Sequence, residues 1–180
     1  TEDEYRSARA STPNAHYTSK EVIEAIYLAL DNFGFGNGNI LEPSMGIGYF
    51  FSLLPEEMRE SRLFGVELDD ISGRIFKQLY QKAEIQIKGY QDTDFENNFF
   101  DVAVGNVPFG DYKVYDREYN KYNFLIHDYF IAKTLDKVRP GGIIAFVTSK
   151  GTMDKQDTSV RKYLAERADL IGAIRLPNNT

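Results

Sequence analysis

Four consecutive residues, Asn106-Val107-Pro108-Phe109, combine side chains that can hold a flat amino group. They follow a strand-like hydrophobic run at residues 99–104, after a single glycine. At the end of a strand, the side-chain oxygen of Asn106 and a nearby backbone carbonyl can accept the two hydrogens of an amine. The ring of Phe109 can lie against the face of the heterocycle that carries this amine. The pattern therefore predicts chemistry on the exocyclic amino group of a planar ring.

Such an amine is a poor nucleophile because its lone pair is delocalised into the ring. Two acceptors on its hydrogens favour a pyramidal nitrogen and free the lone pair to attack an electrophile such as a methyl sulfonium. Positioning and electrostatic stabilisation then supply most of the catalysis. Phe109 could also stack on a base that has been turned out of a duplex. The alternative interpretation is a plain Asn-x-Pro turn after a strand, which is a common structure.

A glycine-rich turn at residues 42–48 (Glu-Pro-Ser-Met-Gly-Ile-Gly) is the second candidate site. Its glycines allow the backbone to approach a ligand closely, and Glu42 at the strand end could face a positively charged amine of a cofactor. The dinucleotide fingerprint is incomplete, because Phe51 stands where a third glycine would follow Gly46 and Gly48. A phosphate-free nucleoside is therefore favoured over a pyrophosphate cofactor. A plain strand–helix turn is the alternative.

Glu67 ends the next strand-like run, at residues 63–67, about twenty residues after Gly48. A carboxylate at this position can accept hydrogen bonds from both hydroxyls of a ribose. Asp69 and Asp70 follow it, so an ordinary surface glutamate is the alternative. The distance from the glycine turn favours the ribose-binding interpretation.

These residues need a scaffold, and the rest of the chain alternates strand-like and helix-like segments. A first helix begins after a cap at Thr18 or Ser19 and ends in the Gly- and Asn-rich stretch at residues 32–39. Further helices are expected at residues 49–54, 71–81, 123–138 and 159–167, and strands at residues 39–41, 63–67, 84–88, 99–104, 143–147 and 170–175. This alternation predicts an α/β fold with a doubly wound, mostly parallel sheet, helices on both faces, and ligands at the carboxyl ends of the strands. The glycine turn, Glu67 and Asn106 all lie at such ends.

At 180 residues and 42% hydrophobic content, the chain (residues 1–180) has the size and composition of one folded domain, with an irregular segment expected at residues 1–15. No apolar run approaches the roughly 20 residues of a membrane span, and the acidic start is unlike a signal peptide. A cytoplasmic location and no membrane partner are therefore expected. Residues 176–180 follow a strand-like run directly, which indicates truncation at the C-terminus and a larger parent protein.

The absence of cysteine and the negative charge narrow the chemistry further. Without cysteine, the chain has no disulfides, no thiolate metal sites and no covalent nucleophile of the kind used in cytosine C5 methylation. An exocyclic amine needs no covalent catalyst, and no metal-ligand spacing stands out. A net charge of −6 is unfavourable for neutralising phosphates, so any DNA is expected to be held mainly by additional domains or subunits.

With these motifs in place, the chain resembles a class I S-adenosylmethionine-dependent methyltransferase of the amino-nitrogen DNA methylase group. The family motif acid-Pro-x-x-Gly-x-Gly is matched by residues 42–48, and its second-strand acid by Glu67. Its Asn-Pro-Pro-aromatic motif is matched except at Val107. The segment His16-Tyr17-Thr18-Ser19 resembles an amino-terminal aromatic-Thr-Pro motif, with Ser19 in place of proline. This order of motifs is similar to that of type I restriction methylation subunits. The segments at residues 105–110 and 136–142 resemble methylase regions of helicase–methylase fusions.

The resemblance implies a Rossmann-like methyltransferase fold, S-adenosyl-L-methionine as cofactor, and transfer to the N6 of a flipped-out adenine in DNA, as in restriction–modification. It implies catalytic roles for Asn106, Val107, Pro108 and Phe109. It also implies that Thr18 binds the methionine carboxylate of the cofactor. The full set of implied cofactor-binding residues is Tyr17, Thr18, Glu42, Pro43, Ser44, Gly46, Gly48, Glu67, Leu68, Gln91, Asp92 and Asn106. RNA or a protein glutamine is an alternative acceptor. A catalytically silent domain that binds cofactor or partners is another alternative.

Weaker candidates follow the catalytic motif. A charged segment at residues 111–122 could be a substrate-side loop or a solvated surface loop, and its aromatic residues are Tyr112, Tyr115, Tyr119 and Tyr122. His127 falls in a helix beside Asp128, where a packing or surface role is favoured over catalysis. Lys150 follows the fifth strand and is expected to be solvated.

Overall fold

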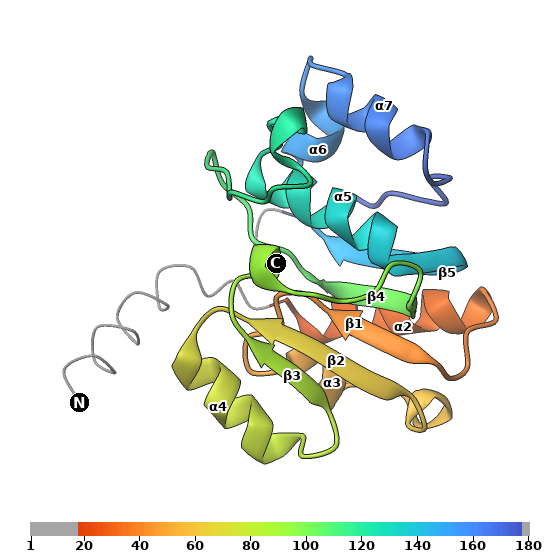
Figure 1. The fold of residues 1–180 in the computed structure, drawn as a ribbon. Helices are drawn as coiled ribbons and strands as arrows, with labels where there is room; N and C mark the ends of the chain where they lie inside the picture. Colours follow the sequence, from red (N-terminus) through yellow and green to blue (C-terminus); the bar gives the residue numbers. More distant parts are fainter. Residues whose placement is uncertain (1–17, 178–180) are drawn as a thin grey trace.

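The computed structural model describes residues 18–177, which contain a five-stranded sheet (Figure 1). The strands lie in the order β3-β2-β1-β4-β5, and every neighbouring pair is parallel. Their bounds are β1 Asn39–Glu42, β2 Arg62–Glu67, β3 Glu84–Ile87, β4 Phe100–Asn106 and β5 Val138–Val147. The chain runs outward from β1 to β3 and then continues on the other side of β1 with β4 and β5. The topological switch therefore lies between β1 and β4, and the expected doubly wound α/β architecture is confirmed.

Helices cover both faces of this sheet, with bounds α2 Lys20–Asn32, α3 Tyr49–Ser52, α4 Asp70–Leu79, α5 Ile126–Lys137, α6 Gly151–Asp154 and α7 Ser159–Ala165. On one face, α2, α3 and α4 bury a cluster that includes Tyr27, Phe51 and Phe76. On the other face, α5 and α7 bury a cluster that includes Tyr129 and Tyr163. The sheet is thus covered on both sides, as a parallel sheet requires.

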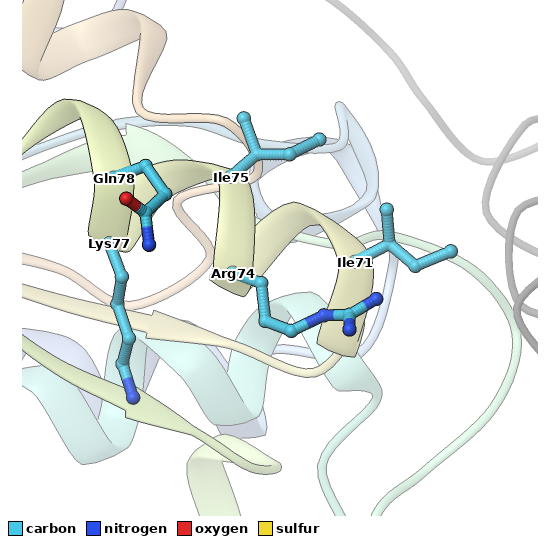
Figure 2. A pocket seen from close by; sticks show the side chains of 5 residues that line it. All are labelled: Ile71, Arg74, Ile75, Lys77 and Gln78. Atoms are coloured by element: carbon cyan, nitrogen blue, oxygen red, sulfur yellow. The ribbon is translucent and has the colours of Figure 1, made fainter.

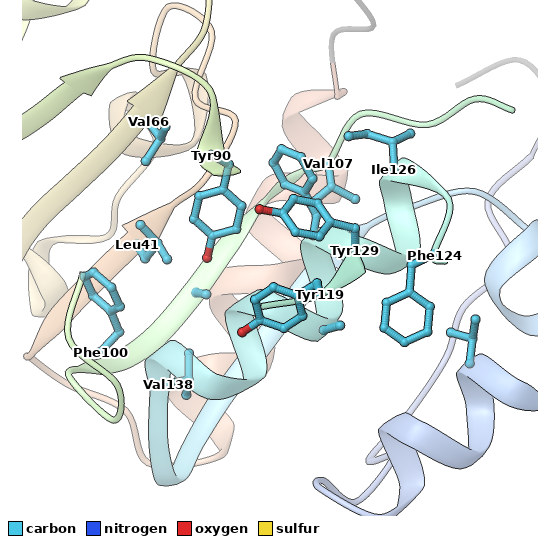
Figure 3. Packing of buried hydrophobic residues seen from close by; sticks show 14 of the residues in the cluster. Leu41, Val66, Tyr90, Phe100, Val107, Tyr119, Phe124, Ile126, Tyr129 and Val138 are labelled. Atoms are coloured by element: carbon cyan, nitrogen blue, oxygen red, sulfur yellow. The ribbon is translucent and has the colours of Figure 1, made fainter. Parts of the chain in front are cut away.

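Successive residues of the central strands pack into opposite clusters. Ile40 and Val102 pack with the α2–α4 cluster, whereas their chain neighbours Leu41 and Ala103 pack with the α5–α7 cluster. Figure 3 shows Leu41 of this second cluster facing the aromatic rings that come from the α5 side. Because successive side chains of a strand point to opposite faces, consecutive apolar residues are what a strand buried on both sides needs. The two clusters together fix the positions of the strand ends.

One expected strand does not form. Residues 168–177 have no regular secondary structure, and Leu170, Ile171 and Ile174 are 70%, 61% and 87% exposed. The prediction of a strand at residues 170–175 is therefore wrong. An apolar pattern reports how well a segment would fill a pleated surface, but a strand also needs a neighbour for its backbone hydrogen bonds. None of the five described strands pairs with this segment.

Other differences from expectation are small. β5 begins earlier than expected because Phe100 pairs with Val138 before a register shift, after which Val102 pairs with Ile143. Ser19 takes the cap position of α2 as expected, but its side chain makes no capping hydrogen bond. The described part of the chain contains no helix with the length and apolar character that a membrane span requires.

The expected irregular segment at residues 1–15 and the cofactor contact from Tyr17 lie outside the described residues. Both stay predictions. The extent of the domain over residues 1–180 stays a prediction as well.

Candidate functional site

Three strand ends meet at the carboxyl edge of the sheet. β1 ends at Glu42, β2 at Glu67 and β4 at Asn106, and β1 lies between the other two. Because the three strands are parallel, these ends lie on the same edge, beside the topological switch (Figure 1). The structure thus brings the glycine turn, Glu67 and the Asn106 loop to one rim.

The Glu67 carboxylate holds the glycine turn against β2. Its Oε2 accepts a hydrogen bond from Gly46 N at 2.7 Å, and its Oε1 accepts one from Asp69 N at 2.7 Å. Burial raises the pKa of Glu67, and these two amides partly offset that rise. Each carboxylate oxygen has two lone pairs, so each keeps acceptor capacity for a ribose hydroxyl. Holding the turn and binding a ribose are therefore compatible roles for one side chain.

Glu42 is deeply buried at the centre of this rim. The residue is 2% exposed, and none of residues 18–177 donates a hydrogen bond to its Oε2. Burial raises the pKa of Glu42 well above its usual value, and the negative charge of Glu67 raises it further. A buried acceptor without a donor is costly unless a ligand supplies one. The side chain therefore fits a cofactor that carries a cationic amine at this point.

Glu42 also borders the strand that carries Asn106. A Cβ atom added at Gly105 would lie 3.4 Å from Cγ and 4.0 Å from Oε1 of Glu42. Gly105 has a φ of +148° and directly precedes Asn106. These are ordinary van der Waals distances, so the positive φ and not a lack of space favours glycine here, and the end of β4 lies beside the Glu42 side chain.

We expect Glu42→Gln to stabilise the protein in the absence of cofactor. The folded-state pKa of Glu42 lies above its unfolded value, so its ionisation costs folding free energy as the pH rises above about 4.5. Glutamine is neutral at every pH and removes that cost. At pH 7–8 the variant should gain on the order of 1 kcal/mol, or about 2–4 °C in melting temperature, and weaken cofactor binding.

Thermal unfolding followed from pH 4 to pH 8 measures this effect. The difference between Glu42→Gln and wild type should shrink towards zero near pH 4, where both side chains are neutral. A difference that stays constant across this range would show that folding does not raise the pKa of Glu42.

The two glycines of the turn have different physical roles. Gly46 has a φ of +55°, and a Cβ atom added there would meet nothing within 4 Å. Gly48 has a φ of +80°, and its Cβ atom would lie 2.0 Å from Cε2 of Phe76, which is fully buried. Only Gly46 thus leaves open space for a ligand, while Gly48 allows α3 to begin against the α2–α4 cluster. The sequence pattern does not distinguish these roles.

Alanine at each glycine should separate stability from cofactor binding. Gly46→Ala should cost about 1–2 kcal/mol for its left-handed backbone and lower cofactor affinity at least about tenfold, because the methyl group enters the open space. Gly48→Ala adds overpacking against Phe76 and should cost on the order of 3 kcal/mol in the free energy of unfolding. Chemical denaturation and calorimetry with S-adenosylhomocysteine measure the two quantities. Equal stability losses would contradict the assignment of Gly48 to packing.

The second residue of the Asn106–Phe109 motif is a valine for a structural reason. Val107 is 1% exposed and belongs to the α5–α7 cluster (Figure 3), and its N–H donates to the carbonyl of Val147 at 3.1 Å. A proline has no N–H and could not make this bond to the end of β5. Asn106 is half-buried at the last position of β4, and Phe109 is 40% exposed at the rim. The departure from Asn-Pro-Pro-aromatic therefore gains a backbone hydrogen bond here.

The remaining predicted cofactor residues lie around the same strand ends. Thr18 directly precedes the cap of α2, and its Oγ1 is buried without a hydrogen-bond partner among residues 18–177. Leu68 follows β2 and is 76% exposed. Gln91 and Asp92 lie in a short 3₁₀ turn after β3, where Gln91 Nε2 donates to Asp92 Oδ2 at 2.9 Å. Pro43 is buried.

The weaker candidates take structural positions. His127 is 3% exposed, and burial lowers its pKa, against the opposing charge of Asp128. Asp128 is fully buried, accepts a hydrogen bond from Thr152 Oγ1 at 3.0 Å and pairs with Lys155. Lys150 is exposed, as expected. Residues 18–177 contain no group of three or more acidic or histidine side chains that could hold a metal ion.

A depression on the outer surface of α4 is separate from the predicted site residues. Figure 2 shows the side chains that line it, which are Ile71, Arg74, Ile75, Lys77 and Gln78. None of the predicted site residues is among them.

A buried ion pair that was not predicted from the sequence joins Asp116 and Lys133 and fixes the segment after Phe109. The available signal was a lysine that follows the apolar residues Ile126, Tyr129 and Phe130 at helical spacing in the predicted helix at residues 123–138.

The sheet order, the glycine turn after β1, the acid that ends β2 and the loop after β4 together define the fold of S-adenosylmethionine-dependent methyltransferases. Over residues 39–179 the chain matches the profile of the Eco57I restriction-modification methylases. This match covers most of the chain, which therefore belongs to the Eco57I restriction-modification methylase family.

Three curated relatives resemble the chain. It is 30% identical over 171 residues to defense against restriction protein B of Escherichia phage P1, which covers 92% of this chain and 7% of the phage protein. It is 31% identical over 93 residues to type II methyltransferase M.CvrRI of Paramecium bursaria Chlorella virus XZ-6E, covering 52% of this chain and 24% of the viral enzyme. It is 25% identical over 167 residues to the rRNA N(6)-adenosine-methyltransferase metl-5 of Caenorhabditis elegans, covering 88% and 74%. The chain thus spans less than a quarter of the length of the first two relatives.

Solved structures share the fold at low sequence identity. A Listeria monocytogenes protein described as a class I S-adenosylmethionine-dependent methyltransferase superposes with a TM-score of 0.67 at 17% identity, covering 83% of this chain and 51% of that protein. A modification subunit described for a type I restriction enzyme of Vibrio vulnificus YJ016 superposes with a TM-score of 0.62 at 15% identity, covering 90% and 40%. These likenesses confirm the expected Rossmann-like methyltransferase fold.

Proposed function

We propose that this chain is the catalytic domain of a DNA adenine-N6 methyltransferase. Its membership of a restriction-modification methylase family and its fold make it a methyltransferase, and its cofactor is S-adenosylmethionine. When bound, this cofactor supplies an electrophilic methyl group on a sulfonium centre. The observation that carries the proposal is the position of the Asn106 loop at the topological switch, beside the strand that ends in the buried Glu42.

In this proposal the rim residues bind different parts of the cofactor. Glu42 Oε2, buried and without a donor, accepts the amine of the methionine part. Thr18 Oγ1, which is also buried and has no hydrogen-bond partner among residues 18–177, donates to the carboxylate of the methionine part. Glu67 accepts the ribose hydroxyls while it keeps Gly46 in place. The open space before Gly46 admits the ligand to the backbone.

Asn106 activates the acceptor amine. Its side-chain oxygen and the carbonyl of Val107 accept the two amine hydrogens, so that the nitrogen lone pair points at the methyl group. The hydrogen bond from Val107 N to Val147 fixes the peptide that carries this motif. Phe109 lies at the rim, partly exposed, and can stack on an extruded base. Positioning supplies the rate enhancement, and the proton then leaves to water.

Adenine N6 is the acceptor that the residues favour most. Asparagine in the first position of the motif resembles adenine-N6 enzymes more than cytosine-N4 enzymes. The chain contains no cysteine for cytosine C5 chemistry. A net charge of −6 supports the view that further domains or subunits hold most of the DNA.

RNA adenine is the second candidate acceptor. The match to an rRNA N(6)-adenosine-methyltransferase covers 88% of the chain, and the acidic net charge favours no particular nucleic acid. The same Asn106 geometry would serve either polymer, because the amine and its ring are identical.

Incubation of the protein with methyl-labelled S-adenosylmethionine and separate samples of duplex DNA, single-stranded DNA, RNA and protein tests this proposal. Digestion to nucleosides should place the label in N6-methyldeoxyadenosine. Label in N6-methyladenosine from RNA would show that RNA adenine, and not DNA adenine, is the acceptor. Cofactor binding without transfer to any polymer would indicate a silent domain.

A further inference from the structure

The loop that follows the catalytic motif presents aromatic rings to solvent. Tyr115 is 79% exposed, the highest value of any aromatic side chain among residues 18–177, and Tyr112 is 53% exposed. They lie three and six residues after Phe109, on a segment that runs from the end of β4 to the start of α5 (Figure 1). Two exposed rings within six residues of a proposed base-binding motif are candidates for contact with the same nucleic acid.

A buried ion pair fixes this loop directly after Tyr115. Asp116 is 7% exposed, and its Oδ2 accepts hydrogen bonds from Tyr129 Oη at 2.7 Å and from Lys133 Nζ at 3.0 Å, both on α5. Burial opposes ionisation of Asp116, but the hydrogen bonds from Tyr129 and Lys133 hold its pKa below the usual value. Its Oδ1 also accepts the backbone N–H of Glu118 at 3.0 Å.

Further contacts hold both sides of Tyr115. The carbonyl of Tyr112 accepts a hydrogen bond from Ile126 N at 2.9 Å, which ties the loop to the start of α5. Tyr119 is 4% exposed and donates to Asp136 Oδ2 at 2.5 Å. Figure 3 shows Tyr119 and Phe124 among the buried side chains of the α5–α7 cluster. The loop therefore alternates buried anchors with exposed rings.

Such a loop is preordered for binding. Because its backbone is already fixed, exposed rings on it can bind a partner without a further loss of loop entropy. The exposed charges of the segment nearly cancel, since it carries three cations (Lys113, Arg117 and Lys121) and two exposed acids (Asp111 and Glu118). Its third acid, Asp116, is already paired with Lys133. A balanced charge does not favour phosphate binding, whereas aromatic rings stack on bases of any sequence.

We propose that residues 110–125 form a stacking platform for an unpaired nucleotide next to the methylated base, with Tyr115 as its principal ring. Turning a base out of the duplex leaves its neighbours unstacked, and a ring on the loop that follows the catalytic motif can replace the lost stacking. The inference rests on the proposed function, because it needs a nucleic-acid strand at the rim.

Binding of single-stranded DNA to the full chain tests the platform. The probe is an oligodeoxynucleotide that contains 2-aminopurine, whose fluorescence falls when it stacks on an aromatic ring. Tyr115→Ala should weaken binding roughly 5- to 150-fold and abolish the quenching, whereas Tyr115→Phe should keep both. Because no phosphate contact is lost, the slope of affinity against salt should not change.

Phe33→Ala is the matched control. Phe33 is 53% exposed, like Tyr112, but follows α2 and precedes β1, at the amino ends of the strands. Its removal should leave binding and quenching unchanged. An equal loss in Phe33→Ala and Tyr115→Ala, or no loss in Tyr115→Ala, would overturn the platform.

Methyl transfer separates this inference from the proposed function. If wild type methylates DNA and Tyr115→Ala has the same KM for DNA, the function stands and the platform is wrong. If wild type shows Tyr115-dependent quenching but transfers no methyl group to DNA, the platform stands and the proposed acceptor is wrong. Cofactor affinity should be the same in wild type and Tyr115→Ala, which shows that both are folded.

Discussion

Replacement of Asn106 by alanine is expected to lower the rate of methyl transfer roughly 10²- to 10³-fold. The substitution removes one of the two acceptors that pyramidalise the amine and leaves the ring held only by stacking. Cofactor affinity should change little, because the proposed contacts of Glu42 and Glu67 with the cofactor come from β1 and β2, whereas Asn106 ends β4. Single-turnover transfer with labelled cofactor measures the rate, and calorimetry with S-adenosylhomocysteine measures the affinity.

Val107→Pro is the matched control for Asn106→Ala. It restores the family motif but removes the N–H that donates to Val147 at 3.1 Å, so a stability loss on the order of 1 kcal/mol is expected, with transfer retained. If Asn106→Ala keeps transfer within about tenfold of wild type while Val107→Pro abolishes it, the backbone and not the Asn106 side chain would be the essential element.

Replacement of Glu67 by alanine is expected to weaken S-adenosylhomocysteine binding roughly 10- to 150-fold. A hydrogen bond to a charged group contributes about 1.5–3 kcal/mol, and the substitution removes the proposed contact with the ribose hydroxyls. It also releases the amides of Gly46 and Asp69, each held at 2.7 Å, so the turn itself loosens. Calorimetry on wild type and variant measures the change.

Asp70→Ala is the matched control for Glu67→Ala. Asp70 is also acidic and lies three residues further on, but it forms an exposed ion pair with Arg74 at 3.1 Å. Exposed pairs of this kind contribute little to stability. Its removal should leave cofactor affinity unchanged. Equal affinity in Glu67→Ala and wild type would remove Glu67 from the cofactor site.

The sequence predicts which residues end the three strands, and the physical reason is local. Glu42, Glu67 and Asn106 each end an apolar run, and parallel strands bring their carboxyl ends to one edge whatever their separation in the chain. The strand order follows from the same rule of doubly wound sheets. Motifs at strand ends therefore carry information about their distance from each other.

Features that depend on contacts between residues far apart in the chain cannot be predicted from the sequence in the same way. The role of Gly48 depends on Phe76, which only the packed α4 brings to it. The anchoring of the loop depends on an ion pair between Asp116 and Lys133, which lies in the second half of α5. The apolar pattern at residues 170–175 predicts a strand because a pattern contains no information about whether a neighbouring strand is present.

A crystal structure with S-adenosylhomocysteine bound would show whether donor and acceptor meet at one rim. We expect the ribose at Glu67, the amine at Glu42, and the sulfur at the rim between Gly46 and Asn106. In front of the sulfur there should be room for a methyl group about 3–3.5 Å from an amine nitrogen held by Asn106. A sulfur that points away from the Asn106 loop, or a ligand bound at another edge of the sheet, would contradict methyl transfer at this rim.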